Sequence, residues 1–365
     1  MKRLFLYGLV LACISFACQN KKDIAPIDLI VDTLTLDHPQ IQAFNTFSIV
    51  NDRVYFAEFN TRKQIASLNL KDKSAEVLNL HKLYDSIPEG ILTYNVISRD
   101  SILLLSKYTN KFYLINRKLE VLKKWDFQEQ KLKGHLFLPP LNFTQSKIQA
   151  AIVYSHNSQA ADSILSLKEI AQKSFTNALV SPIFLEFNLS QDTLNQGDFL
   201  LKNLISRFLE STQYSSEGRH FTYNSKNKIY TSCRVDSLFV INNTDLSISS
   251  FQLNSKFFDS LKISPVTIDK LIENEMKILT KGAHCSSAHY SPTLNTYFVF
   301  LADNRSGKKV IQLYSSSQQL IHEEIIDKNI LIHQLLEYDG SVYLLNKTKL
   351  NSLQLLEINP SLYAQ

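Results

Sequence analysis

The chain has 365 residues, of which 44% are hydrophobic and 20% are charged, with a formal net charge of +5 at pH 7. The charge falls to +3 once Lys2 and Arg3 are removed with the leader described next, and both signs are interspersed along the chain. A nucleic-acid-binding protein is expected to carry a basic patch or stripe, so the composition excludes nucleic acid as a partner.

Residues 1–17 have the organisation of a lipoprotein signal peptide. A positively charged start precedes the apolar segment Leu4–Phe16, and the small residue Ala17 precedes Cys18. About 13 apolar residues are too few to span a bilayer, which needs roughly 20. We therefore predict cleavage before Cys18 and attachment of lipid to that cysteine. An ordinary secretory signal with an incidental cysteine, or cleavage before Cys13, is the alternative.

The residues that follow the lipidation site, 18–28, are polar and predict a solvated tether. The membrane is thus one predicted partner, contacted through the N-terminal lipid, and the folded part lies in the cell envelope. Two thiols remain beyond the tether, Cys233 and Cys285. An exported compartment would permit a disulfide between them. No Cys or His residues occur at the spacing of metal ligands, so no metal is predicted.

From residue 29 to residue 365 the chain repeats a unit of short strands separated by polar turns. With only 8 Gly, these turns are expected to use Asn, Asp and Lys. Three of the five spacings between units are 45–48 residues, and four-stranded propeller blades repeat at roughly 40–50 residues. The pattern predicts an all-β fold, a six-bladed β-propeller. The second strands of the six units are expected to start near residues 53, 101, 148, 229, 296 and 341.

Helical insertions account for the two longer spacings. Apolar residues at helical spacing predict short helices near 160–176, 201–210 and 264–281. In the last of these, Ser264 is suited to the N-cap and Pro265 to the first helical position. The apolar faces of these helices are expected to pack on the rim of the propeller, and binding of a partner protein is the alternative.

The segment Leu29–Leu36 alternates between apolar and polar residues as a strand does. We expect it to pair with the last unit of the chain as its outer strand. This pairing would close the ring and remove two exposed sheet edges. A pair of β-sandwiches is the alternative fold, and it would need a linker that the sequence lacks.

The signal peptide, the six units and the stretch from Gly282 to Phe298 (Gly-Ala-His-Cys-Ser-Ser-Ala-His-Tyr-Ser-Pro-Thr-Leu-Asn-Thr-Tyr-Phe) resemble the six-bladed propeller lipoproteins of Bacteroidota. Among these, the chain is most similar to the family labelled domain of unknown function 4221. The resemblance covers most of the mature chain. It implies the fold and a location on the outer rather than the inner membrane, and it offers no catalytic residues to carry over.

One recurrence marks a candidate ligand pocket. Glycine precedes a histidine at the start of the innermost strand in three units, where the central channel of a propeller lies. Arginines among these residues suit bidentate contact with a carboxylate or sulfate. The favoured alternative is structural, with each histidine bonded to a neighbouring carbonyl group. The candidate pocket residues are His135, Arg219, His220, His284, His289, Tyr290 and Arg305.

No enzyme signature occurs in the sequence: it lacks GxSxG, HExxH, a phosphate-binding loop and GxGxxG. Catalytic residues are therefore unknown, and no cofactor is predicted. We expect a non-catalytic binding or scaffold module of the cell envelope, with a protein or glycan as its ligand. The alternatives are an envelope hydrolase with its active site at the propeller centre, and a lipoprotein that senses a ligand. An enzyme requires acid and base groups converging in one deep pocket.

Overall fold

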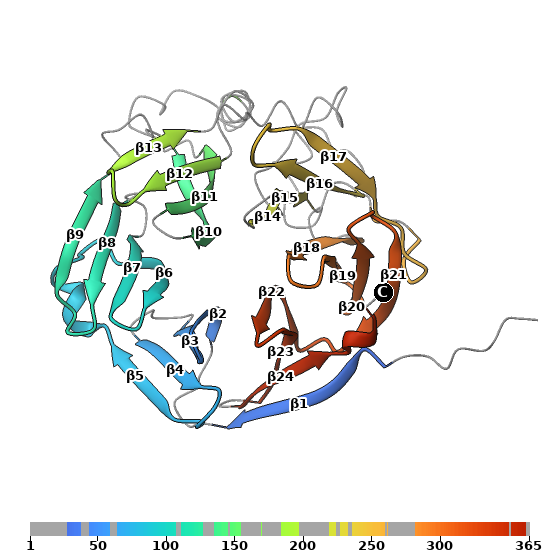
Figure 1. Cartoon of the computed structure of the whole chain (residues 1–365), viewed down its shortest axis with the longest axis horizontal. Coiled ribbons are helices and arrows are strands. Elements are labelled where there is room, and N and C mark those ends of the chain that lie inside the picture. The colour runs from blue at the N-terminus through green and yellow to red at the C-terminus, as the bar shows by residue number, and fades with distance from the viewer. Residues whose placement is uncertain are drawn as a thin grey trace, which may run out of the picture.

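The computed structural model is an all-β ring of small antiparallel sheets (Figure 1). It describes residues 28–37, 44–58, 64–106, 111–126, 135–144, 147–154, 169, 184–196, 219–223, 227–232, 236–259, 261, 282–349 and 352–362. Within these residues the strands form six four-stranded sheets, and the arrangement is propeller-like. The predicted all-β architecture of repeated small sheets is thus confirmed.

Five of the six sheets consist of four consecutive strands, each paired with the next. The first three of these sheets contain β2 (Phe44–Val50), β3 (Arg53–Glu58), β4 (Gln64–Asn69) and β5 (Ala75–Asn79); β6 (Ile91–Ser98), β7 (Ser101–Ser106), β8 (Lys111–Asn116) and β9 (Val121–Asp126); and β10 (His135–Thr144), β11 (Lys147–Tyr154), β12 (Phe184–Asn188) and β13 (Thr193–Gln196).

The next two sheets contain β14 (Arg219–Tyr223), β15 (Asn227–Ser232), β16 (Ser237–Asn242) and β17 (Ile248–Gln252); and β18 (Ala283–Ser291), β19 (Thr296–Asp303), β20 (Lys308–Ser315) and β21 (Leu320–Ile326). The sixth sheet joins β22 (Ile330–Tyr338), β23 (Ser341–Lys349) and β24 (Ser352–Ile358) to β1 (Ile30–Asp37). Two 3-10 turns, His81–Tyr84 and Pro360–Leu362, also lie in the described part of the chain.

The turns between strands use the residue types expected from the low glycine content. Asn51, Lys73, Asp192, Asn295 and Asp339 all have positive φ angles, between 49° and 58°. Tight hairpin turns require this left-handed conformation, which Asn and Asp tolerate best after glycine. The prediction that Asn, Asp and Lys replace glycine in the turns is confirmed at these positions.

The hydrophobic core lies between neighbouring sheets. The described residues form five apolar clusters, and each of them joins side chains of two sheets that are adjacent in the ring. In one cluster Phe298 and Phe300 of β19 pack with Val342 and Leu344 of β23, and all four side chains are at most 1% exposed. Each such side chain contributes about 1.5–3 kcal/mol on burial. Because both faces of a sheet are covered, the middle strands are continuously apolar: seven of the eight residues of β19 are buried.

The first strand of the chain pairs with the last one. β1 lies antiparallel to β24, with Leu34 opposite Leu355, and the two strands lie side by side in Figure 1. Leu29, just before β1, is 3% exposed, and its carbonyl oxygen accepts a 2.8 Å hydrogen bond from the Asn359 backbone N–H. The predicted pairing of segment 29–36 with the last unit is confirmed.

Several sequence predictions fall outside the described residues. The leader 1–17 and tether residues 18–27 are among them, as are the predicted helices near 160–176, 201–210 and 264–281, except for Glu169, which is helical. The described part of the chain contains no helix that is both long enough and apolar enough to cross a membrane.

One face of the ring carries the start of β1, and we call it the entry face. In a four-stranded meander the first and third turns lie at the same end of the sheet. Contacts between neighbouring sheets join these ends: the Tyr338 hydroxyl donates to Asp52 Oδ1 at 3.0 Å, and the Thr293 hydroxyl donates to Glu337 Oε2 at 3.3 Å. Asp28 lies at this end of the sixth sheet, because Asn359 Nδ2 donates to its carbonyl oxygen at 3.0 Å.

Candidate functional site

Three of the predicted pocket residues lie on one strand, β18, but on different faces of it. Tyr290 packs against Tyr297 with ring centroids 4.7 Å apart, in the cluster shared with β14–β17. His289 instead meets Phe300 edge-on at 6.0 Å, and Phe300 belongs to the cluster shared with the sixth sheet. His289 and Tyr290 therefore do not converge on one pocket.

His284 is 8% exposed, and its Nδ1 lies 3.5 Å from the carbonyl oxygen of Gly282. Burial lowers the pKa of this imidazole, which opposes its protonation at neutral pH. The neighbouring carbonyl is the partner that the structural interpretation assigned to this residue. The geometry at His284 thus fits a buried neutral side chain.

The remaining pocket candidates lie on the face opposite the entry face. Arg305 is in the turn between β19 and β20, where its backbone N–H donates to Asp303 Oδ1 at 3.0 Å. His135 starts β10, and Arg219 and His220 start β14. The side chains of these three residues lie outside the described part of the structure, as does Cys233. A shared pocket for the predicted residues therefore stays a prediction.

The second cysteine of the predicted disulfide, Cys285, is buried in β18. Its side chain is 1% exposed, and the Sγ atom lies 3.7 Å from the carbonyl oxygen of Ser287. The disulfide with Cys233 stays a prediction.

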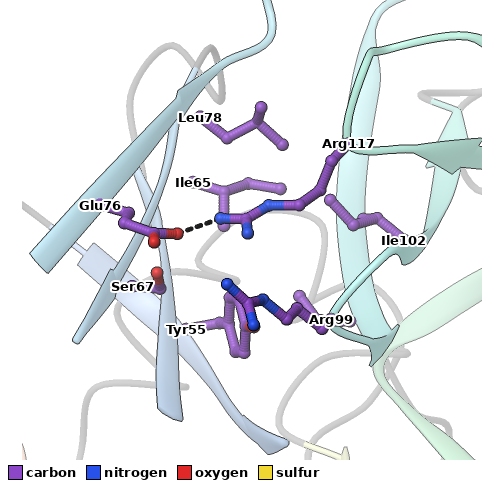
Figure 2. A pocket seen from close by; sticks show the side chains of 9 residues that line it. Tyr55, Ile65, Ser67, Glu76, Leu78, Arg99, Ile102 and Arg117 are labelled. Carbon is purple, nitrogen blue, oxygen red and sulfur yellow. Dashed lines mark hydrogen bonds and ion pairs between the residues drawn. The ribbon is translucent and has the colours of Figure 1, made fainter. Parts of the chain in front are cut away.

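A different cluster of charged side chains forms a hollow on the entry face, between sheets β2–β5 and β6–β9 (Figure 2). The first sheet contributes Tyr55 of β3 and Glu76 of β5. The second contributes Arg99 from the β6–β7 turn and Arg117 from the β8–β9 turn. We call this cluster the arginine hollow. Its full lining is Tyr55, Ile65, Ser67, Glu76, Leu78, Val96, Arg99, Ile102 and Arg117.

Glu76 is the central carboxylate of the arginine hollow. Arg117 Nη2 donates a hydrogen bond to Glu76 Oε2 across the junction of the two sheets. Arg53, beside the hollow, lies with its Nη2 3.6 Å from Glu76 Oε1. The hydrogen bond from Arg117 is the largest influence on Glu76, and together with the nearby guanidinium charges it lowers the pKa of the carboxyl group. Glu76 is therefore ionised at neutral pH.

Arg53 is held in place by its own partners. Its Nη1 donates to Ser67 Oγ at 3.2 Å, and its Nη2 donates to Ser74 Oγ at 3.0 Å. Arg99 differs from Arg53 in being exposed. Its guanidinium group donates no hydrogen bond to any of the described residues. Three guanidinium groups therefore act on the Glu76 carboxylate, and positive charge exceeds negative charge at the hollow.

Tyr55 and the aliphatic residues give the hollow its floor and walls. The Tyr55 side chain is 5% exposed, and burial raises the pKa of its phenol, so the hydroxyl group is neutral and can donate a hydrogen bond. The enclosed space is small, about 10 Å³, close to what one water molecule needs. The arginine hollow can thus hold an anionic group at its mouth and has no room for a whole small molecule.

A second hollow on the entry face has a volume of about 170 Å³ and lies between the β18–β19 and β22–β23 turns. Its lining is acidic, with Glu337 and Asp339 beside Thr293 and Ser341. Among the described residues no group of three or more His, Cys, Asp or Glu side chains is placed to hold a metal ion. This second hollow carries no assigned chemistry.

The ring of four-stranded sheets places the chain among propeller-like proteins, and two solved structures of similar fold come from Bacteroides. A member of the domain of unknown function 4221 family from Bacteroides vulgatus superposes with a TM-score of 0.66 at 15% identity, covering 90% of this chain and 97% of that one. A predicted exported protein from Bacteroides fragilis superposes with a TM-score of 0.50 at 8% identity, covering 90% and 96% of the two chains.

The resemblance to family 4221 that the sequence indicated is thus present in the fold. Neither a protein-family model nor a curated protein matches the sequence.

Proposed function

We propose that this protein is a lipid-anchored binding module of the cell envelope that holds a negatively charged protein or glycan at the arginine hollow. One observation carries the proposal: Arg53 and Arg117 contact the carboxylate of Glu76, Arg99 lines the same hollow, and no hydrogen bond from Arg99 is found among the described residues. Guanidinium groups bind carboxylate, sulfate and phosphate through charge-assisted hydrogen bonds. Glu76 itself is held in an ion pair, so the arginine hollow offers no uncommitted carboxylate as a general base, which favours binding over hydrolysis.

The proposal takes the ring as a complete six-bladed propeller closed by β1. It is supported by the six four-stranded sheets and by the pairing of β1 with β24. The innermost strands β2, β6, β10, β14, β18 and β22 also contact one another in sequence around the ring. A closed ring removes exposed strand edges and gives a rigid frame for a surface site.

The proposed location is the periplasmic or outer surface of the envelope, with the outer membrane favoured over the inner. The leader with Cys18 supports this location, and so does the similarity in fold to an exported Bacteroides protein. One acyl chain binds a membrane only reversibly, so stable anchoring at Cys18 would need more than one chain.

Replacing Cys18 by alanine is expected to release the protein from the membrane. The full chain would be expressed in a Bacteroides host and followed by fractionation and by mass spectrometry of the N-terminal peptide. We expect wild-type protein in the membrane fraction with a lipid-modified N-terminus, and the Cys18→Ala variant in the soluble fraction. Cys13→Ala is the matched control and should stay in the membrane. If the Cys13→Ala variant appeared in the soluble fraction instead, the lipid anchor would be assigned to Cys13.

Arg99→Gln and Arg117→Gln are each expected to weaken binding of a polyanionic glycan by about tenfold or more, because a charge-assisted hydrogen bond contributes about 1.5–3 kcal/mol. Binding of dextran sulfate and of polygalacturonate would be measured by isothermal titration calorimetry at low salt. Lys118→Gln removes the same charge from an exposed neighbour and should change the affinity less than about twofold.

Equal affinities for all four proteins would remove the arginine hollow from the proposed function. Shortening of either polymer by the wild-type protein would overturn the non-catalytic assignment in favour of an envelope hydrolase.

A further inference from the structure

We infer that the group held by the arginine hollow is a tetrahedral oxyanion, a phosphoryl or sulfuryl group, and not a carboxylate. This inference rests on the proposed function and specifies the chemistry of its ligand. It is carried by the directions of the available donors and by the excess positive charge of the cluster around Glu76.

The donors available to a ligand lie on one side of the hollow. Arg53 is committed to Ser67, Ser74 and Glu76, so it contributes charge and no open donor fork. Arg117 commits one nitrogen to Glu76. Arg99, with no such hydrogen bond among the described residues, and the rest of the Arg117 guanidinium therefore form the open part of the site.

The guanidinium groups of Arg99 and Arg117 lie at different positions in the hollow. Figure 2 shows Arg117 reaching toward Glu76 on the side of Leu78, and Arg99 on the side of Tyr55. A planar carboxylate has two oxygen atoms and pairs best with a single guanidinium fork in one plane. The oxygen atoms of a tetrahedral oxyanion point in directions that do not share one plane, so it can accept hydrogen bonds from both guanidinium groups. The donor arrangement therefore favours phosphate or sulfate.

Glu76 already supplies the carboxylate that this cluster can pair with edge-on. After Glu76 is counted, the cluster keeps an excess of positive charge, and a phosphate monoester carries about −1.5 to −2 at pH 7. Charge matching therefore favours a phosphoryl group over a singly charged carboxylate.

The walls of the hollow suit a group presented at the end of a larger ligand. Aliphatic side chains of Ile65, Leu78 and Ile102 line the hollow beside the guanidinium groups, and the neutral Tyr55 hydroxyl is a further donor. The enclosed volume of about 10 Å³ keeps the anion at the mouth, with the rest of its ester outside.

The test is calorimetric titration of the full-length protein with inorganic phosphate, sodium sulfate and sodium acetate at pH 8 and constant ionic strength. We expect phosphate to bind about tenfold or more tightly than acetate, and Arg99→Gln to remove about tenfold of the phosphate affinity. Arg99→Lys keeps the charge but loses the bidentate guanidinium group, so its phosphate affinity should lie between those of the wild type and Arg99→Gln. Lys118→Gln should match the wild type.

Two further measurements separate ligand binding from a merely structural role of the arginines. Glu76→Gln removes the competing negative charge, so phosphate affinity should rise about fivefold. Lowering the pH from 8 to 5 converts phosphate to its monoanion and should weaken its binding, while sulfate binding stays constant. Glucose 6-phosphate and glucose 6-sulfate then distinguish a phosphate ester from a sulfate ester.

Acetate that binds as tightly as phosphate and sulfate would overturn this inference. If binding of polyanions still depended on Arg99 in that case, the proposed function would stand with a carboxylate ligand. If neither Arg99→Gln nor Arg117→Gln changed the affinity for any anion, the inference and the proposed function would both be overturned.

Discussion

Replacing Leu34 by proline is expected to lower the free energy of unfolding by about 3 kcal/mol or more and to separate β1 from β24. Leu34 lies in the middle of β1, opposite Leu355 of β24, and its side chain packs against the apolar cluster between the sixth sheet and β2–β5. Proline removes a backbone donor of the ladder between β1 and β24. Loss of this pairing would expose the edge of β24, and exposed edges promote association between copies.

Thr33→Pro is the matched control for this substitution. The Thr33 backbone N–H donates to Asp32 Oδ1 at 2.7 Å, so it points away from β24 and makes no ladder hydrogen bond. We expect Thr33→Pro to change the urea unfolding midpoint far less than Leu34→Pro does. Size-exclusion chromatography would follow association. Equal stability of Leu34→Pro and the wild type would show that the pairing of β1 with β24 does not stabilise the fold.

The second large effect is expected at Glu323, where replacement by alanine should lower the free energy of unfolding by about 3 kcal/mol. This carboxylate is 9% exposed and accepts hydrogen bonds from Ser255 Oγ at 2.5 Å, Gln312 Nε2 at 2.8 Å and the Lys256 backbone N–H at 3.2 Å. It thereby joins β20 and β21 to the segment after β17 in the neighbouring sheet. Alanine would remove the acceptor shared by these three donors, of which the Gln312 amide is fully buried.

Glu324→Ala controls for the loss of a carboxylate from the same strand. The Glu324 side chain is 43% exposed and pairs with His322 at 3.0 Å, so its removal should change stability by less than about 1 kcal/mol. Urea unfolding monitored by the fluorescence of Trp125, the single tryptophan, would measure both variants. A loss at Glu324→Ala as large as at Glu323→Ala would contradict the role of the buried network.

The repeat and the strands that build it could be predicted closely from the sequence. The second strands of the units start at residues 53, 101, 147, 227, 296 and 341, against predicted starts near 53, 101, 148, 229, 296 and 341. These strands are buried on both faces, so they are continuous apolar runs bounded by polar turns. The outer strands are harder to recognise: four of the six residues of β9 are exposed, including Lys123 and Lys124.

The arginine hollow was missed because its parts look like ordinary surface turns. Arg99 and Arg117 mark the first and third turns of one sheet, and the meander places those turns at the same end. That spacing was a usable signal for two of the arginines. Glu76 belongs to the neighbouring sheet, and its contact with Arg117 depends on how the two sheets pack, which periodicity in one chain segment does not reveal.

The histidine recurrence was a weaker guide for a reason visible in β18. Successive side chains of a strand point to opposite faces, so the neighbours His289 and Tyr290 could be expected to separate. The structure places them against different clusters. Strand alternation should therefore be applied before residues of one strand are assigned to a common pocket.

The chain enters the ring at the same face that carries the arginine hollow. With Cys18 anchored as proposed, the ten residues 18–27 reach at most about 35 Å, which would keep the start of β1 on the entry face within that distance of the bilayer. This closeness would favour anionic groups that are attached to the same membrane surface over those that diffuse in from the bulk fluid.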